Sequence, residues 1–180
     1  MNNKLLIPFL LVLFTFFSCA EEQNFDQLDD LSVVPTLATG IFYFESPEDV
    51  INSLPPGNFY NQTFTFEAFN EAFVSERVLD GSITYQLENT TSKELSLLVE
   101  FLDETDTVLD SEVFTVQPQP SPLLEREVVY GDTGKSLDIL RNTTRIRVSS
   151  ENLGNNSSES TANDPRIILR SSAVFRVRLQ

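Results

Sequence analysis

ELSLLVEFLDETDTVLDSEVFTV, residues 94–116, is the stretch that decides the fold class of this chain. Side chains alternate between the two faces of a strand, so its first part places four apolar residues on one face: Leu95, Leu97, Val99 and Phe101. The acidic run 103–106 predicts a turn, and residues 107–116 return as a second strand. The stretch therefore predicts an antiparallel hairpin with one buried face.

Similar strand patterns lie on both sides of this hairpin. They cover residues 37–45, 63–66, 82–87, 125–130, 145–149 and 166–179. Asp80-Gly81 predicts a turn before the third of them. Proline has no backbone N–H for a sheet, so the proline-rich stretch 117–122 is predicted to be a crossing loop.

Two short helices are predicted between the strands. Ser46 is expected to cap the first, with Pro47 at its first position and its end before Pro55. The second is predicted over residues 136–142. Residues 151–164 are polar and lack an apolar period, which predicts a mobile loop.

Short strands separated by turns, with no long helix, predict an all-β fold. The expected architecture is an antiparallel immunoglobulin- or fibronectin-like β-sandwich with one or two short helices. A small β-barrel is the alternative. The chain has one cysteine and no tryptophan, so it lacks the Cys–Trp–Cys signature of antibody domains. Residues 37–180 are predicted to form this single domain.

The first 18 residues have the layout of a secretory signal peptide. Lys4 supplies the basic start, and an apolar run over residues 5–17 follows it. This run is shorter than the roughly 20 apolar residues that a membrane-spanning helix needs. A small residue, Ser18, stands directly before Cys19, which is the only cysteine of the chain.

The run Phe16-Phe17-Ser18-Cys19 resembles the lipobox of bacterial lipoproteins. The resemblance implies cleavage before Cys19 and attachment of acyl chains such as palmitate to it, so that the protein reaches the membrane through lipid. Glu21 and Glu22 resemble the export signals of Bacteroidota-type lipoproteins. This second resemblance implies an outer-membrane, lipid-anchored and cell-surface-exposed protein, with residues 19–36 as an acidic tether.

The net charge and the composition exclude several classes of partner, metal site and reaction. The formal net charge of −15 argues against nucleic acid as a partner, because the phosphate backbone repels an acidic protein. The chain has no histidine, which removes the most frequent general base and metal ligand. With a single cysteine besides, zinc sites of the His/Cys type are excluded. We therefore expect no cofactor, no metal and no enzymatic activity.

A set of arginines forms the most distinct candidate binding site in the sequence. Four of them take outward positions at period-two spacing in predicted strands: Arg145, Arg147, Arg176 and Arg178. Acidic residues are expected opposite them, in one of two pairs: Glu94 with Glu100, or Glu125 with Glu127. The set has two interpretations, a ladder of salt bridges on a solvated sheet face or a docking face for an acidic partner or a polysaccharide.

The predicted hairpin tip carries two further candidates. Asp106-Thr107-Val108 resembles the acceptor motif for O-glycosylation of exported Bacteroidota proteins, which implies a glycan on Thr107. Carboxylates clustered at 103–106 are the ligand type that calcium prefers. Their spacing matches no calcium-loop template, so a plain hairpin tip is favoured.

Three functions remain open. The first is a lipid-anchored, non-enzymatic interaction module, an accessory subunit of a cell-envelope complex with an envelope protein as its partner. The second is a surface carbohydrate- or matrix-binding module. The third, a small hydrolase that uses paired carboxylates, is the weakest because nothing singles out one pair among 27 acidic residues.

Overall fold

The computed structural model describes residues 32–66 and 76–179. In chain order these residues form β1 (Thr36–Pro47), α3 (Glu48–Ser53), β2 (Gly57–Thr65), β3 (Val78–Asn89), β4 (Leu95–Leu102), β5 (Val108–Val116), β6 (Leu124–Tyr130), α5 (Leu137–Asn142), β7 (Arg145–Asn152) and β8 (Arg166–Val177). Within this part of the chain, no helix combines the length and the apolar character needed to cross a membrane.

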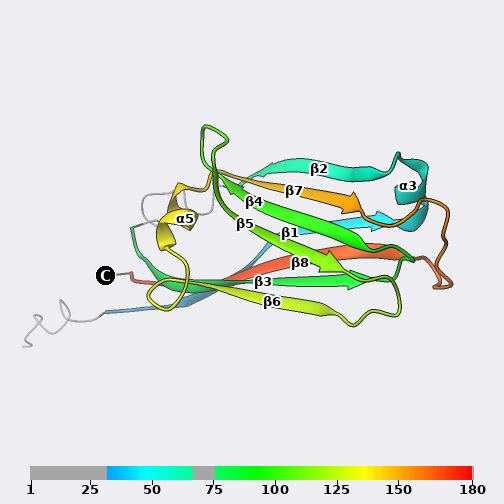
Figure 1. The fold of residues 1–180 in the computed structure, drawn as a ribbon. Coiled ribbons are helices and arrows are strands. Elements are labelled where there is room, and N and C mark those ends of the chain that lie inside the picture. Colours follow the sequence, from blue (N-terminus) through cyan, green and yellow to red (C-terminus); the bar gives the residue numbers. More distant parts are fainter. Residues whose placement is uncertain (1–31, 67–75, 180) are drawn as a thin grey trace, which may run out of the picture. The chain divides into compact units, whose positions relative to one another are not determined.

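The strands form two four-stranded antiparallel sheets that face each other (Figure 1). Sheet A has the order β1-β8-β3-β6, and sheet B has the order β2-β7-β4-β5. The predicted all-β sandwich is confirmed, and the sheets do not close into the alternative barrel. The predicted hairpin of residues 94–116 is the β4–β5 pair.

The connectivity within this sandwich is that of a jelly roll. The first two strands lie in opposite sheets, and β1 pairs with the last strand. An immunoglobulin-like sandwich instead keeps its first two strands in one sheet, whereas eight strands in two such sheets form a jelly roll. Residue alternation predicts which face of a strand is buried, but it does not specify which strands become neighbours.

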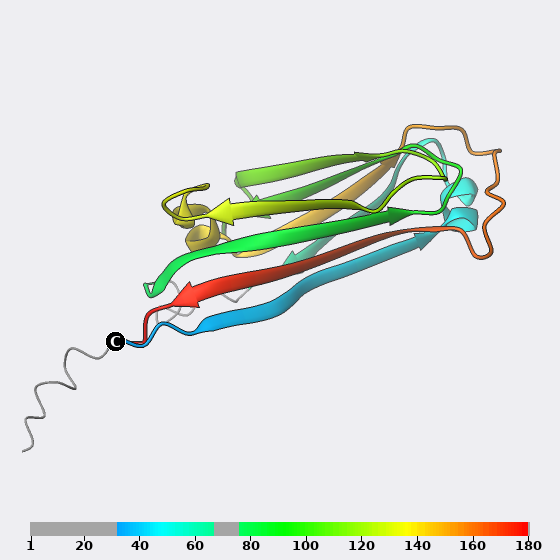
Figure 2. The ribbon, with the colours of Figure 1, turned by 90° about the horizontal axis from the view of Figure 1, so that it is seen from below.

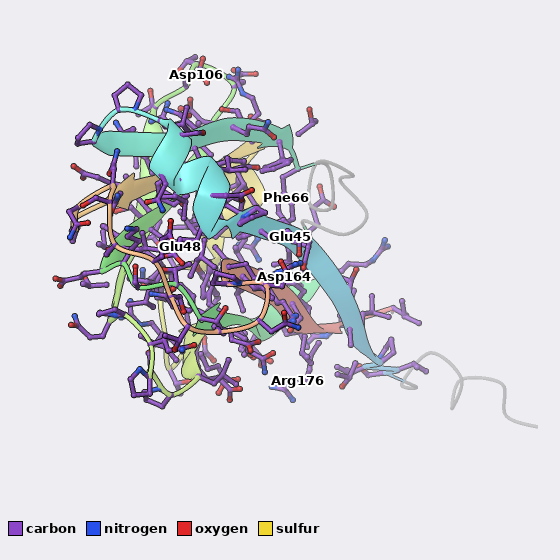
Figure 3. The ribbon with its side chains drawn as sticks, turned by 90° about the vertical axis from the view of Figure 1, so that its right-hand side faces the viewer. Glu45, Glu48, Phe66, Asp106, Asp164 and Arg176 are labelled. Atoms are coloured by element: carbon purple, nitrogen blue, oxygen red, sulfur yellow. The ribbon has the colours of Figure 1, made fainter. Side chains whose placement is uncertain are left out.

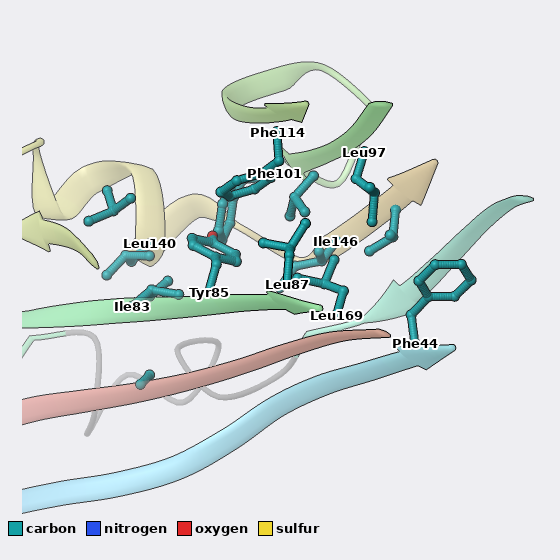
Figure 4. Close-up of a cluster of buried hydrophobic side chains, with 14 of the residues drawn as sticks. Phe44, Ile83, Tyr85, Leu87, Leu97, Phe101, Phe114, Leu140, Ile146 and Leu169 are labelled. Carbon is teal, nitrogen blue, oxygen red and sulfur yellow. The ribbon is translucent and has the colours of Figure 1, made fainter. Parts of the chain in front are cut away.

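The core lies between the inner faces of the sheets (Figure 4). Sheet A contributes Tyr85 and Leu87, and sheet B contributes Leu97, Phe101 and Phe114, all 0% exposed. The rings of Tyr85 and Phe114 meet across the sandwich, with their centroids 5.2 Å apart. Burying one such large apolar side chain stabilises the fold by about 1.5–3 kcal/mol.

Different kinds of side-chain contact join the two sheets at the two sides of the sandwich. Between β1 and β2 the contact is aromatic: the Phe44 and Tyr60 ring centroids are 4.2 Å apart. Between β5 and β6 it is ionic. The Lys135 ammonium lies 2.7 Å from both Asp110 and Glu112 carboxylates, and Arg126 lies 3.1 Å from Glu112. The core cluster between the sheets itself consists of hydrophobic residues.

The predicted turn at Asp80-Gly81 is wrong, because both residues lie inside β3. A Cβ atom on Gly81 would lie 2.1 Å from Cδ1 of Phe175 and 2.5 Å from the carbonyl oxygen of Val174. The glycine is therefore explained by the close approach of Phe175 from the neighbouring strand β8, and not by a change of chain direction.

Both predicted helices are present, but Ser46 does not cap the first one as expected, whereas the second has a cap that was not predicted. Ser136 accepts a hydrogen bond from the backbone N–H of Asp138 (3.1 Å) at the start of α5. Helix α3 begins after Pro47, and no side chain caps it. Ser46 instead lies at the end of β1, which continues to Pro47 in pairing with β8. Strand pairing therefore displaces the expected cap.

Candidate interaction surfaces

Arg145 and Arg147 lie on the outer face of sheet B, as predicted from their alternation with buried Ile146 and Val148. Arg147 stands directly opposite Glu100 on β4, and its Nε lies 2.7 Å from the carboxylate. This carboxylate raises the pKa of Arg147. Of the two acidic pairs expected opposite the arginines, only Glu100 makes this contact.

Arg176 and Arg178 belong to the other side of the molecule. Arg176 lies on the outer face of sheet A and pairs with Asp80 of β3. Arg178 is exposed beyond the end of β8, where its backbone N–H donates to the carbonyl of Arg77 (2.9 Å). Figure 3 shows Asp106, the ion-pair partner of Arg145, on the side of the sandwich opposite Arg176.

The four arginines therefore do not form one docking face. Outward positions on β7 and β8 point away from each other, because these strands belong to opposed sheets. The sequence shows that each pair is outward, but it does not show which sheet holds each strand. Most of these arginines also have carboxylate partners, so the salt-ladder interpretation applies to Arg147 and Arg176.

The outer face of sheet B has an apolar pair at its centre. Leu98 of β4 and Val113 of β5 stand directly opposite each other. Val113 is 54% exposed, although it lies in the middle of a well-formed strand. Arg147 and Glu100 lie beside this pair on the same face. The surface thus combines exposed apolar area with a charged pair.

The hairpin tip is organised by Asp103. One carboxylate oxygen accepts hydrogen bonds from the backbone N–H groups of Thr105 (2.8 Å) and Thr107 (2.9 Å) and from the Thr105 hydroxyl (2.8 Å). These bonds lower the pKa of Asp103 below its ordinary value of 3.8. The predicted plain hairpin tip is thus explained by turn hydrogen bonds. Thr107 is exposed there, and its glycosylation stays a prediction.

Acid is expected to destabilise the domain through Asp103 and Asp80, whose pKa is lowered by the hydrogen bond from Arg176. A lowered folded-state pKa means stabilisation that is present above the ordinary value of 3.8 and lost as pH falls below it. We expect the free energy of unfolding in urea to fall between pH 5 and about pH 2. The Asp103→Asn variant keeps an acceptor oxygen that does not titrate. Its free energy of unfolding should therefore fall less over this pH range than that of the wild type. Equal falls in both proteins would contradict this role of Asp103.

A buried ion pair lies at the α3 end of the sandwich. Lys93 is 0% exposed and Glu48 is 3% exposed, with Nζ 3.9 Å from Oε1. The ammonium donates to the carbonyl (2.6 Å) and hydroxyl (2.7 Å) oxygens of Ser158. Burial lowers the pKa of Lys93, and the charge of Glu48 opposes this shift.

The Glu48 carboxylate is held by three donors besides the lysine. Oε1 accepts from the backbone N–H (2.8 Å) and hydroxyl (2.5 Å) of Ser92, and Oε2 accepts from the N–H of Ser160 (2.9 Å). Sequence reasoning missed this cluster. Its only sequence signal is a lone lysine two residues before β4, in a strongly acidic part of the chain.

The loop after β7, predicted to be mobile, is held in place by this cluster. Ser158 and Ser160 both contact it, and Asn156 donates to the carbonyl of Leu54 after α3 (2.6 Å). Asn155 accepts from the N–H groups of Ser157 and Ser158, which makes a local turn. These polar contacts fix the position of the loop.

The lipid-attachment candidate Cys19 and the signal peptide lie outside the described residues. The described part begins with an extended segment beside the C-terminal end of β8. Val177 donates to the carbonyl of Pro35 (3.1 Å), and Leu179 donates to that of Val33 (2.9 Å). Helix α3 lies at the far end of β1 from this entry point (Figure 1).

Comparison with known proteins assigns no family. No family model and no curated protein sequence matches. Among solved structures, the infectious bursal disease virus VP2 subviral particle aligns over 81% of this chain at 11% identity and a TM-score of 0.39. A Bacillus endospore appendage protein aligns over 83% of this chain and 92% of its own, at 10% identity and a TM-score of 0.35.

This chain spans about a third of the length of the viral protein, 32%. Both likenesses are too distant in sequence and in TM-score to carry an argument about function.

Proposed function

We propose that this protein is a lipid-anchored interaction module of the cell envelope, held at the outer membrane by acylated Cys19 and exposed at the cell surface. In this proposal it is a non-enzymatic accessory subunit that binds another envelope protein. The lipobox-like run ending at Cys19 is the observation that carries the anchor.

The place where the tether enters the domain supports this role. The described chain enters at Val33, at the end of the sandwich where Leu179 also lies. A tether that holds the domain at this end leaves the outer faces of both sheets accessible. An anchored module needs such accessible faces in order to reach a neighbouring protein.

We propose the outer face of sheet B as the partner-binding surface. Val113 and Leu98 supply apolar area at its centre, and Arg145 and Arg147 lie on the same face. Arginine beside an apolar centre is typical of protein interfaces. This proposal keeps the β7 half of the four-arginine set and leaves out Arg176 and Arg178.

An affinity pull-down from detergent-solubilised native membranes tests the proposal. We expect one membrane protein to co-purify in stoichiometric amount with the wild-type chain. Val113→Glu places a charge at the centre of the surface, so it should reduce capture at least about tenfold, because an unpaired charge in an interface costs several kcal/mol. Val174→Glu, on the outer face of sheet A, is the matched control and should retain capture.

The alternative is a surface carbohydrate- or matrix-binding module, and one observation favours it. The outer face of sheet B carries many hydroxyl side chains, which can hydrogen-bond a sugar: Thr63, Thr65, Ser96, Ser111, Thr115 and Ser149. If the pull-down yields no protein and the purified chain binds a polysaccharide in a Val113-dependent way, this alternative replaces the protein partner.

A further inference from the structure

The outer face of sheet A is divided by charge. Strand β8 presents three arginines outward: Arg166, Arg170 and Arg176. Strand β3 lies beside β8, and β6 lies beside β3 (Figure 2). These two strands present four acidic residues: Asp80, Glu88, Glu125 and Glu127. The β1–β8 half of this face is therefore enriched in positive charge, although Glu45 of β1 lies there and pairs with Arg166 at 3.3 Å, and the β3–β6 half is enriched in negative charge.

A row of small side chains crosses this face between the charged residues. Strand register aligns Ala38, Val174, Ser82 and Val129 in one row across all four strands. Val174 and Val129 are 42% and 41% exposed. A hollow of about 330 Å³ lies over Val174, Ser82 and Val129 of this row, and the Arg176–Asp80 pair and Glu127 also line it. A second flat surface can approach closely here, because no long side chain stands in the row.

We infer that this face binds the same face of a second copy of the chain. A two-fold axis that runs along the strands, between β8 and β3, places β8 of one copy over β3 of the other. Arg176 then faces Asp80 of the second copy, and Val174 faces Ser82 of the second copy. The edge strands match as well, since Ala38 of β1 faces Val129 on β6 of the second copy.

Charge complementarity selects this axis over the alternative. An axis across the strands would place β8 over β8, so the arginine-bearing strands of the two copies would face each other. The axis along the strands gives each arginine-bearing position an acidic or polar neighbour in the second copy, in both directions at once. A two-fold interface requires such a self-complementary surface.

The size of the face fits a weak, reversible dimer. Four strands at about 4.8 Å spacing, over about 30 Å of strand length, present roughly 600 Å² per copy. Two copies would bury roughly 1,200 Å², at the lower end of specific protein interfaces. Because the central row is only modestly apolar, the association should depend on concentration and weaken with salt.

Sedimentation equilibrium of the purified full chain in density-matched non-ionic detergent tests this inference. We expect a polypeptide mass that rises with concentration from one copy to two, and a dissociation constant that increases several-fold at high salt. Val174→Glu places like charges against each other across the axis, so it should give the monomer mass at all concentrations. Val113→Glu, on the outer face of sheet B, should dimerise as the wild type does.

Chemical cross-linking gives a second readout that does not depend on a disruptive variant. Val174→Cys brings two thiols to within about 8 Å across the proposed axis, so a short thiol-specific cross-linker should yield a dimer on a denaturing gel. Val113→Cys and the wild-type chain are the controls. A monomeric wild type, a dimer that survives Val174→Glu, or equal cross-linking through Val113→Cys would overturn the inference. These results are independent of whether an envelope partner is found.

Discussion

Replacing Glu48 by alanine is expected to destabilise the domain by about 3–5 kcal/mol, the largest stability effect of any single polar substitution proposed for it. The substitution leaves the Lys93 ammonium, 0% exposed, without its compensating carboxylate. It also removes the acceptor of three hydrogen bonds from Ser92 and Ser160. Urea denaturation with an unchanged m-value would measure the loss.

A double-mutant cycle separates the ion pair from general disruption. In Glu48→Ala/Lys93→Met the buried charge is gone, so the double variant should be more stable than the sum of the single losses predicts, by at least about 1 kcal/mol. Glu88→Ala is the surface control. Its partner Arg170 lies 3.6 Å away with both side chains 47% exposed, so its loss should stay below about 1 kcal/mol. Additive single losses would contradict a coupled buried pair.

Replacing Cys19 by serine is expected to move the protein from the membrane fraction to the soluble fraction. Each buried methylene of an acyl chain contributes about 0.8 kcal/mol to membrane binding, and serine offers no thiol for the lipid. Fractionation of cells that express each variant measures the change, and intact mass should show loss of the acyl increment.

Ser18→Ala is the matched control for this experiment. It keeps a small residue directly before the cysteine, so we expect it to be processed and to stay with the membrane. If Cys19→Ser remained in the membrane fraction as the wild type does, the lipid anchor would be wrong. The interaction module would then need another means of attachment.

Local patterns predicted the parts of the fold that depend on neighbours in sequence. The alternation in 94–116 identified the β4–β5 hairpin, and the helix expected over residues 136–142 matches α5. The errors came where a distant segment decided the local structure. Gly81 lies inside a strand because Phe175 packs against it, and Ser46 is kept from capping α3 by pairing with β8.

The candidate binding residues also show which properties a single strand decides and which depend on distant segments. Outward positions of Arg147 and Arg176 followed from period-two spacing, since that property belongs to each strand alone. Their separation onto opposite faces did not, because it depends on which sheet each strand joins. The buried pair of Glu48 and Lys93 joins residues 45 positions apart near a loop without apolar pattern, so the lone lysine in the sequence could not identify its partner.

The sequence by itself determined the all-β class, the buried faces of β4, β7 and β8, and the candidate anchor at Cys19. Each of these follows from short-range periodicity or from a contiguous motif. Only the tertiary structure decided the jelly-roll order, the partition of the arginines between two faces and the charge division of sheet A. Strand pairing joins residues far apart in the chain, and the free energy of that pairing depends on the whole set of partners, which no single stretch encodes.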